Sequence, residues 1–483
     1  MTSSQTPMRR WIWVLFFVLL ILGALRWQDA KESWLELTRK ASPARLSTLP
    51  PYGAYPEATP PEGFEHFFDF VSSDPAIEDR AEPLIEAGWD ESHAVFLLEL
   101  AHVQGMTPRI QDLLTRNTSQ KYTQNKDWWQ WVWSQDPTMP PRYAKFKAVV
   151  YSVIDYRFHE YFDDDPASTI RLNEIRWGGV MRDSIPPLES PEKIAAADVE
   201  YLEDDNVIFG VEINGEAVAY PKRILAWHEM VKDVVGGESI NGVYCTLCGS
   251  MIVYRTTVDG VHHDFGTSGF LYRSNKLMYD RATQSLWSTF KGEPVVGPLV
   301  GQGIRLAPLP VVTSTWGAWR QRHPETTVLS LNTQHSRDYA EGAALRDYFS
   351  TDELLFPVPK RDERLRNKDE VLAIRLLDFP DDQLAVSTDF LSMHPVYQAQ
   401  IGSINFVVLT DTSGSSRVYE TSGRQFAAWD GENTVRDDDE SSWQVTEAAL
   451  VREDSAEQLN RLPAHRAFWF GWYSVYPETR LVQ

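Results

Sequence analysis

The sequence predicts an α+β protein with an N-terminal membrane anchor, a helical domain and two related β-rich modules that form a degenerate internal repeat. Three patterns support this prediction. An unbroken apolar run lies near the N-terminus, apolar residues then recur with a helical period, and short alternating segments bounded by turn residues follow. The 483 residues also exceed the ~250–300 at which a single core stops growing, so we expect several domains.

Composition narrows the class of partner. Hydrophobic residues make up 43% of the chain, which is enough to bury sizeable cores, whereas 68 acidic against 46 basic residues give a net charge of −22. A field of this sign repels nucleic acid, so we expect no DNA or RNA partner.

Residues 1–30 are predicted to anchor the protein in a membrane through the apolar run at 11–25. Fifteen residues are short for a ~30 Å hydrocarbon core, but snorkelling by Arg26 would lengthen the span. Arg9 and Arg10 favour a cytoplasmic N-terminus. We therefore expect a single-pass inner-membrane protein with most of its chain in the periplasm or extracytoplasmic space. A cleaved signal peptide is the competing interpretation.

A linker and a helical domain are predicted next. Residues 31–63 become rich in Pro, Ala and Ser and read as a semi-rigid linker. Residues 64–165 carry apolar residues at spacings of three and four, which predicts helices. A tryptophan cluster within this domain is typical of a packed core: Trp128, Trp129, Trp131 and Trp133.

The first β-rich module is predicted over 166–345. Strands at 207–213 and 217–220 flank Asn214-Gly215, a hairpin signal because both central residues adopt positive φ. Pro221 then opens a helix, and strands at 240–244 and 251–258 flank a C-x-x-C-G turn.

The second module, 346–483, contains no cysteine but repeats part of the first. The stretches 306–329 and 459–482 align without a gap, which predicts one fold for both modules, with a site in the first copy only. The matching positions are Leu309/Leu462, Pro310/Pro463, Trp316/Trp469, Trp319/Trp472 and Pro-Glu-Thr at 324–326/477–479.

Several long strings resemble one bacterial family. EINGEAVAYPKRILAWHEM, VYCTLCGSMIVY, FGTSGFLYRSNKLMYDRATQSLWSTFKGEPVVGPL and WGAWRQRHPETTVLS are similar to the domain of unknown function 3179 family, over roughly residues 170–483. Lys232 departs from that family's common pattern, in which an Asn stands at this place. The resemblance implies no established reaction.

Cys245 and Cys248 are the candidate centre of the site. A C-x-x-C-G turn between two strands is typical of zinc and rubredoxin-type knuckles, because the turn points both sulfurs to one side. His228, on the apolar side of the Pro221 helix, is the candidate third ligand for Zn²⁺ or Cu⁺. A structural disulfide and a redox-active pair remain alternatives, and a buried core histidine is the alternative for His228.

Polar residues after the cysteines are candidates for ligand binding. A small-residue loop at 266–269 would permit close approach of a bound group, and an arginine fork suits a carboxylate or phosphate. The alternative is a set of pairs that only brace the loop. The candidates are His263, Ser268, Arg273, Asn275, Tyr279, Asp280 and Arg281.

Two functions remain open at the sequence level. The first is a membrane-anchored extracytoplasmic protein with a metal-binding or metal-assisted site at C-x-x-C-G. The second is a non-catalytic binding or assembly module in which the cysteines form a structural disulfide. The chain contains no G-x-S-x-G, Walker or H-E-x-x-H motif, so the sequence leaves open whether it is an enzyme.

Overall fold

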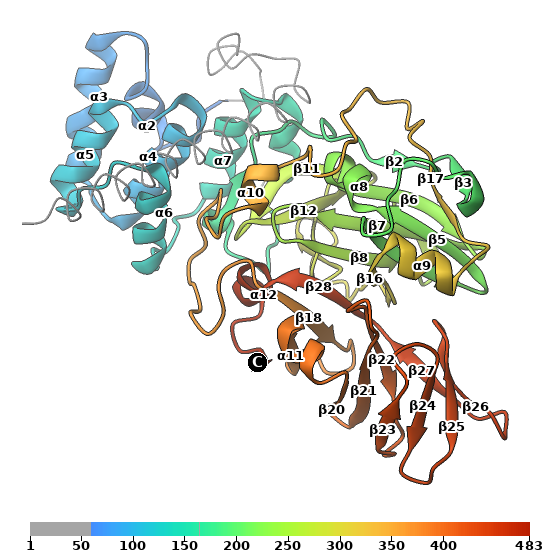
Figure 1. Ribbon diagram of the computed structural model, residues 1–483. Coiled ribbons are helices and arrows are strands. Elements are labelled where there is room, and N and C mark those ends of the chain that lie inside the picture. The colour runs from blue at the N-terminus through green and yellow to red at the C-terminus, as the bar shows by residue number, and fades with distance from the viewer. Residues whose placement is uncertain (1–58, 164) are drawn as a thin grey trace, which may run out of the picture.

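The computed structural model describes residues 59–163 and 165–483, with the helical part at one end, sheets in the middle and a strongly curled sheet at the other end (Figure 1). The predicted anchor at 1–30 and nearly all of the predicted linker lie outside these residues. Across 59–163 and 165–483, no helix is both long and apolar enough to cross a membrane.

The helical domain begins its helices at capping residues. The side chains of Asp74, Asp90 and Thr107 each accept an N–H from the first turn of the helix that follows. Trp128 and Trp129 are fully buried in the domain core. The helices are α2 (Glu65–Asp69), α3 (Pro75–Ala87), α4 (Glu91–Gln104), α5 (Pro108–Thr118), α6 (Asn125–Ser134) and α7 (Tyr143–Ser152).

A buried ion pair joins this domain to the first sheet. Lys147 Nζ lies 2.6 Å from Glu99 Oε1, and both side chains are fully buried. Tyr143 and Tyr151 donate their hydroxyls to the same carboxylate. Lys147 also donates to the carbonyl of Ile175 at 2.7 Å. Because every charge in the group is hydrogen-bonded, the buried pair fixes how the helices sit on the sheet.

Three five-stranded sheets form the middle of the molecule. The first runs β1 (Ile175–Trp177), β11 (Phe265–Tyr272), β12 (Asn275–Asp280), β13 (Leu286–Ser288), β14 (Glu293–Val296). The second runs β15 (Pro308–Leu309), β8 (Ser250–Arg255), β7 (Glu238–Cys245), β6 (Met230–Val235), β2 (Leu188–Glu189). The third runs β16 (Val312–Thr315), β4 (Val207–Ile213), β5 (Glu216–Pro221), β17 (Thr327–Leu329), β3 (Lys193–Ala195). The helices α8 (Lys222–His228) and α9 (Trp316–Arg322) follow β5 and β16, and a small hairpin joins β9 (Thr257–Val258) to β10 (Val261–His262).

The C-terminal part contains a four-stranded and an eight-stranded sheet. The first runs β28 (Ala464–Phe468), β18 (Glu370–Arg375), β19 (Gln383–Ser387), β29 (Arg480–Val482). The second runs β20 (Val396–Ile401), β21 (Ile404–Thr410), β22 (Ser416–Glu420), β27 (Gln458–Leu462), β26 (Ala449–Arg452), β25 (Ser442–Val445), β24 (Thr434–Asp437), β23 (Phe426–Trp429). Its helices are α10 (Arg346–Phe349), α11 (Thr388–Met393) and α12 (Trp469–Val475).

The eight-stranded sheet curls until its two end strands meet. Phe426 N–H in β23 donates to Gln398 Oε1 in β20 at 3.0 Å, and Gln398 Nε2 approaches the Phe426 carbonyl at 3.4 Å. A glutamine side chain thus spans the seam where a backbone ladder would close a barrel.

One local arrangement occurs twice. The sheets β16-β4-β5-β17 and β28-β18-β19-β29 share strand order, with two antiparallel pairings followed by one parallel pairing. The indole N–H of Trp319 in α9 donates to Thr326 Oγ1 at 3.0 Å, and that of Trp472 in α12 donates to Thr479 Oγ1 at the same distance.

The predicted fold class nevertheless needs correction. The described residues contain no spanning helix, and the protein is a mixed α+β structure with a β-rich C-terminal region and a nearly closed eight-stranded sheet. The matched stretches 306–329 and 459–482 each cover three strands and a helix, and upstream of them β4-β5-α8-β6-β7-β8 and β18-β19-α11-β20-β21-β22 follow the same order along the chain. The curled sheet has no counterpart of its size among the strands of residues 166–345.

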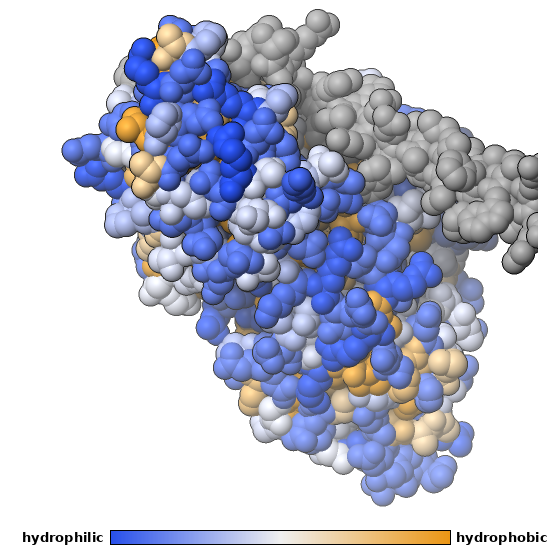
Figure 2. Space-filling view, turned by 90° about the vertical axis from the view of Figure 1, so that its left-hand side faces the viewer, coloured by the Kyte–Doolittle hydropathy of each residue, from blue (hydrophilic) through white to orange (hydrophobic). Residues whose placement is uncertain are grey.

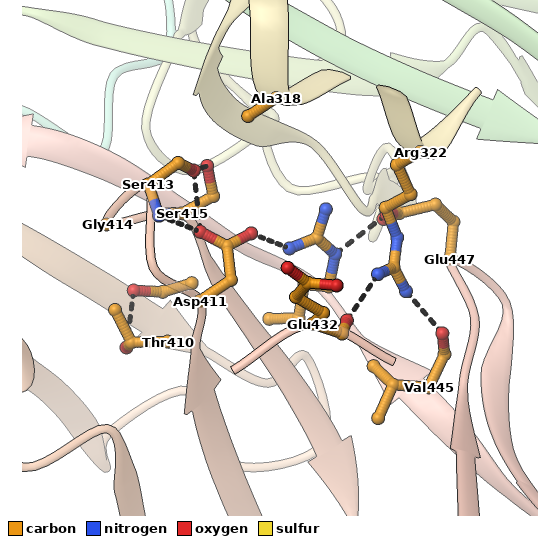
Figure 3. Close-up of polar contacts among 12 residues, drawn as sticks. Ala318, Arg322, Thr410, Asp411, Ser413, Gly414, Ser415, Glu432, Val445 and Glu447 are labelled. Carbon is orange, nitrogen blue, oxygen red and sulfur yellow. Dashed lines mark hydrogen bonds and ion pairs between the residues drawn. The ribbon is translucent and has the colours of Figure 1, made fainter. Parts of the chain in front are cut away.

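Buried charges join the curled sheet to the middle of the molecule (Figure 3). Glu447 is 4% exposed and lies 2.7 Å from Arg417, 2.7 Å from Arg461 and 3.1 Å from Arg322 of α9. The positive charges hold the pKa of this carboxyl well below its usual range despite burial, which would raise it. One carboxylate therefore neutralises cations from both sides of the junction.

The described surface is mostly hydrophilic on the face in Figure 2, with apolar residues gathered in its lower half. The large apolar side chains that are exposed come from separate segments, as is normal for protein surfaces. They are Leu84, Tyr156, Val234, Val261, Leu331 and Met393.

Candidate functional site

The C-x-x-C-G turn connects β7 to β8. Cys245 pairs with Ser250 across the hairpin, and the N–H of Cys248 donates to the carbonyl of Cys245 at 3.1 Å. Gly249 has φ +59°, and a Cβ at this position would lie 2.9 Å from the Phe468 ring. Glycine is therefore required here both by the turn and by the neighbouring β28.

The two cysteines are free thiols buried in contact with each other. Cys245 is 1% exposed and Cys248 is 0% exposed. Burial raises the pKa of the Cys248 thiol well above its usual value, and the neighbouring Cys245 sulfur adds to this by accepting the Cys248 proton.

The pKa of the Cys245 thiol shifts in the opposite direction. Burial and the charge of Glu229 oppose its ionisation, but the thiol of Cys248 and the backbone N–H groups of Lys276 and Cys248 all donate to its sulfur. Together these donors lower the pKa of Cys245 below its usual value. The pair thus favours a thiolate at Cys245 beside a thiol at Cys248.

Residues distant in sequence enclose this pair. Asn275 Nδ2 donates to Cys248 Sγ at 3.3 Å, and the carbonyl of Ser274 lies 3.4 Å from the same sulfur as an alternative acceptor of its proton. A Cβ on Gly471 of α12 would lie 3.2 Å from Cys248 Sγ. The Tyr348 hydroxyl donates to the Leu247 carbonyl at 2.7 Å. The C-terminal part of the chain therefore covers the site directly.

Lys276 and Glu229 belong to the site although no sequence motif singles them out. Lys276 Nζ lies 3.2 Å from Glu229 Oε2, with side-chain exposures of 6% and 9%. Glu229 has φ +56°, a strained conformation for this residue, just after α8. Lys276 directly follows Asn275 and Glu229 directly follows His228 in the sequence. This adjacency to predicted site residues is the one sequence signal that could have identified them.

The structure does not bring His228 to the cysteines. One ring nitrogen lies 2.9 Å from the Pro186 carbonyl and the other 2.5 Å from the Tyr339 hydroxyl. Burial lowers the pKa of His228 to about 4, so the ring is neutral. Within residues 59–163 and 165–483 no three His, Cys, Asp or Glu side chains are grouped to hold a metal ion, so the predicted Cys245–Cys248–His228 site is not formed there.

The remaining predicted residues separate into small groups. His263 Nδ1 lies 2.9 Å from Asp280 Oδ2, and the other ring nitrogen is buried without a hydrogen-bond partner in the described chain. Ser268 is fully buried and donates to the Leu277 carbonyl at 2.6 Å. Arg273 donates to Glu174 at 2.5 Å. Each contact braces the first sheet, as the alternative interpretation expects.

Tyr279 and Arg281 meet at a carboxylate that the sequence motifs do not mark. The guanidinium of Arg281 donates to both oxygens of Asp183, at 2.7 and 3.1 Å, and the Tyr279 hydroxyl donates to it at 2.5 Å. Asp183 also accepts the N–H of Thr267. This carboxylate already satisfies the arginine fork, and of the predicted polar residues only Asn275 contacts the cysteines.

Comparison with known proteins identifies a family but no characterised relative. No curated protein and no solved structure matches the chain significantly. A family model described as "Protein of unknown function (DUF3179)" matches residues 182–479, which include the C-x-x-C-G turn and the helix that covers it. The chain belongs to the DUF3179 family.

Proposed function

We propose that Cys245 and Cys248 work as a reversible dithiol–disulfide pair that senses oxidants. The observation that carries this proposal is the pair of free thiols buried together on one turn, with the Asn275 amide and the Ser274 carbonyl at Cys248 Sγ. The pKa of Cys245 is lowered and that of Cys248 is raised, which favours a thiolate beside a thiol. A stabilised thiolate next to a resolving thiol is the arrangement that thiol-based redox chemistry needs.

Burial selects the class of oxidant. Because the Cys245 side chain is nearly inaccessible, a small hydroperoxide suits the site better than another protein's disulfide. The Cys245 thiolate attacks the peroxide oxygen, giving a sulfenic acid and the leaving alkoxide or hydroxide, which takes up a proton. The Cys248 sulfur, giving up its proton, then attacks the Cys245 sulfur and releases water, which closes the disulfide.

Oxidation of the pair would change the packing of the C-terminal part of the chain. Disulfide formation draws Cys248 Sγ towards Cys245 and away from Asn275 and the Ser274 carbonyl. The Gly471 backbone packs on the same sulfur, so α12 has to adjust. We therefore infer a sensor in which the redox state of the pair alters the packing of α12.

A mass and thiol assay tests the proposal cleanly, because the chain has only 2 cysteines. Hydroperoxide should remove about 2 Da and both thiols, reversibly with a dithiol reductant. Cys248→Ser should stop at a sulfenic acid that dimedone traps, whereas Cys245→Ser should react much more slowly. Equal reactivity of the two variants, or a wild-type dithiol that survives excess hydroperoxide, rejects the proposal.

A second candidate is binding of Cu⁺ by the two sulfurs alone. It is favoured by the backbone N–H that Cys248 directs at the Cys245 sulfur, a feature of metal knuckles, and Cu⁺ is a soft ion that thiolates select. Tetrahedral Zn²⁺ would need two more ligands. One Cu⁺ bound by the reduced protein and lost in either Cys→Ser variant would support it, and no uptake would reject it.

A further inference from the structure

We propose that a cleft between the first sheet and the C-terminal part binds a small oxyanion with several acceptor oxygens, a phosphate or a dicarboxylate. This site is separate from the cysteine pair and goes beyond the redox function. The cleft encloses about 350 Å³, enough for a small metabolite-sized ion. Its charged lining residues are Lys291, Glu293, Arg305, Arg375, Asp381 and Glu478.

Both halves of the chain supply the cationic groups. Glu293 begins β14, Lys291 lies two residues before it, and Arg305 lies in the segment between β14 and β15. Arg375 ends β18, and Tyr476 directly follows α12. A ligand in the cleft would therefore contact two parts of the molecule at once.

Positive charge is in excess inside the cleft. Glu293 Oε1 lies 2.8 Å from Arg375 and 3.4 Å from Arg305, so one carboxylate serves two guanidinium groups. The ammonium of Lys291 makes no hydrogen bond among the described residues, and burial and the nearby charges of Glu293, Arg375 and Arg273 act on it. Inside the cleft Lys291 and Arg375 face the single carboxylate of Glu293, which leaves one positive charge uncompensated there, while Arg305 is 44% exposed at the rim. Asp381 and Glu478 are exposed at the rim.

Two buried polar groups in or beside the cleft lack partners. The side chain of Arg375 is only 9% exposed, and its Nε has no hydrogen-bond partner among the described residues. In the adjoining cavity, which Arg375 also lines, the buried Nε2 of His465 is unpartnered too. A buried donor without an acceptor costs free energy, and an oxyanion in the cleft supplies an acceptor for Arg375 Nε.

The environment of Lys291 agrees with this geometry. Burial lowers the pKa of its ammonium, Glu293 partly opposes the shift, and Arg375 and Arg273 add to it. Repulsion between like charges in a partly buried cleft is relieved when an anion binds. The acidic rim disfavours long polyanions such as nucleic acid, so a small ion with a compact charged head fits best.

The test measures binding of inorganic phosphate and of succinate to the full-length protein by calorimetry, with acetate as the comparison that has fewer acceptor oxygens. Lys291→Met and Arg305→Gln remove one charge each without cutting into a core. Arg320→Gln is the matched control, because Arg320 is a half-exposed surface residue paired with Asp204. Cys245→Ser separates this site from the redox pair.

Saturable binding of phosphate or succinate by the wild type is expected, with acetate weaker, and the ion that binds tighter identifies the source. Lys291→Met and Arg305→Gln should each weaken binding about tenfold, or ~1.4 kcal/mol, while Arg320→Gln and Cys245→Ser should bind like the wild type. Neither ion binding, wild-type affinity in the two cleft variants, or equal losses in Arg320→Gln would overturn the proposal. Loss in Cys245→Ser would overturn the separation of the two sites.

Discussion

The pKa values of the two cysteines shift in different directions mainly because the thiol of Cys248 donates to the sulfur of Cys245. Both sulfurs are equally buried, yet only Cys245 receives two backbone N–H donors in addition to the thiol of Cys248. Hydrogen bonds to the charged form favour ionisation, and burial alone opposes it. The thiol of Cys248 is therefore the largest of the effects that lower the pKa of Cys245, and two backbone N–H groups add to it.

Asn275 gives a residue-scale test of the resolving step. Its amide lowers the pKa of Cys248 against the larger effect of burial, so Asn275→Leu should raise that pKa further. Disulfide closure needs the Cys248 thiolate. At neutral pH it should slow about tenfold for each pH unit by which this pKa rises, with its pH profile displaced upwards. Stopped-flow measurement separates this step from sulfenic acid formation at Cys245, which should keep its rate. Slowing of both steps would contradict the assignment.

His228 makes stability depend on pH. Its pKa is about 4 in the folded protein, against an ordinary value of 6.5. Below 6.5 the unfolded chain takes up a proton that the folded protein excludes, so stability is lost as the pH falls from 6.5 towards 4. The loss should reach ~3 kcal/mol. In His228→Gln the free energy of unfolding should fall less steeply over this range, whereas His394→Gln, at an exposed position, should keep the wild-type slope.

How much of the site can be predicted from the sequence depends on how far apart its residues lie along the chain. Cys245, Cys248 and Asn275 come together because they lie on neighbouring hairpins of one short stretch. Local spacing placed His228 on the buried side of its helix. It could not show that Pro186 and Tyr339, from distant loops, would occupy both ring nitrogens. Lys276 and Glu229 were missed because an ion pair across two sheets leaves no local pattern.

At the scale of elements, α12 is the feature that links the site to the rest of the molecule. Gly471→Ala would place a Cβ 2.9 Å from Cys248 Cβ, and the fully buried turn leaves no free space. Overpacking of this kind should destabilise the protein by ~1–3 kcal/mol and change the reactivity of the thiols. Denaturant unfolding and thiol kinetics measure the two effects. In Gly88→Ala the nearest atom lies 3.6 Å away, so this control should change little.

The positions of the strands were easier to predict from the sequence than the pairing between them. The predicted strands at 207–213 and 217–220 correspond to β4 and β5, because alternating apolar residues and Asn214-Gly215 are local signals. The parallel pairing of Val218 with Thr327 is not local, and neither is the eight-stranded sheet. Composition at those positions is compatible with many sheets, so only packing decides among them.

At the scale of the whole molecule, Glu447 holds the curled sheet against the middle sheets (Figure 3). Glu447→Gln would leave Arg417, Arg461 and Arg322 without their shared counter-charge. Removal of one member of a buried ion cluster costs about 3–5 kcal/mol. Denaturant unfolding followed by tryptophan fluorescence should show this loss.

The Glu447 prediction is tested by a control variant and by the size of the stability loss. Glu440→Gln is the control, because this carboxylate is 87% exposed and lies 4.0 Å from its arginine, so it should leave stability nearly unchanged. A loss below about 1 kcal/mol in Glu447→Gln would mean that the junction is held by packing alone.

The parallel pairing of β5 with β17 has a consequence for synthesis of the chain. β5 ends at Pro221 and β17 begins at Thr327, and most strands of two other sheets are encoded between them. At about 5–20 residues per second, a ribosome needs roughly 5–20 s to reach the second strand after finishing the first. During that interval the edge of β5, with Val218 and Ala219, is open to pairing with other nascent chains. Early handling by chaperones would then decide how much of the protein reaches its native form.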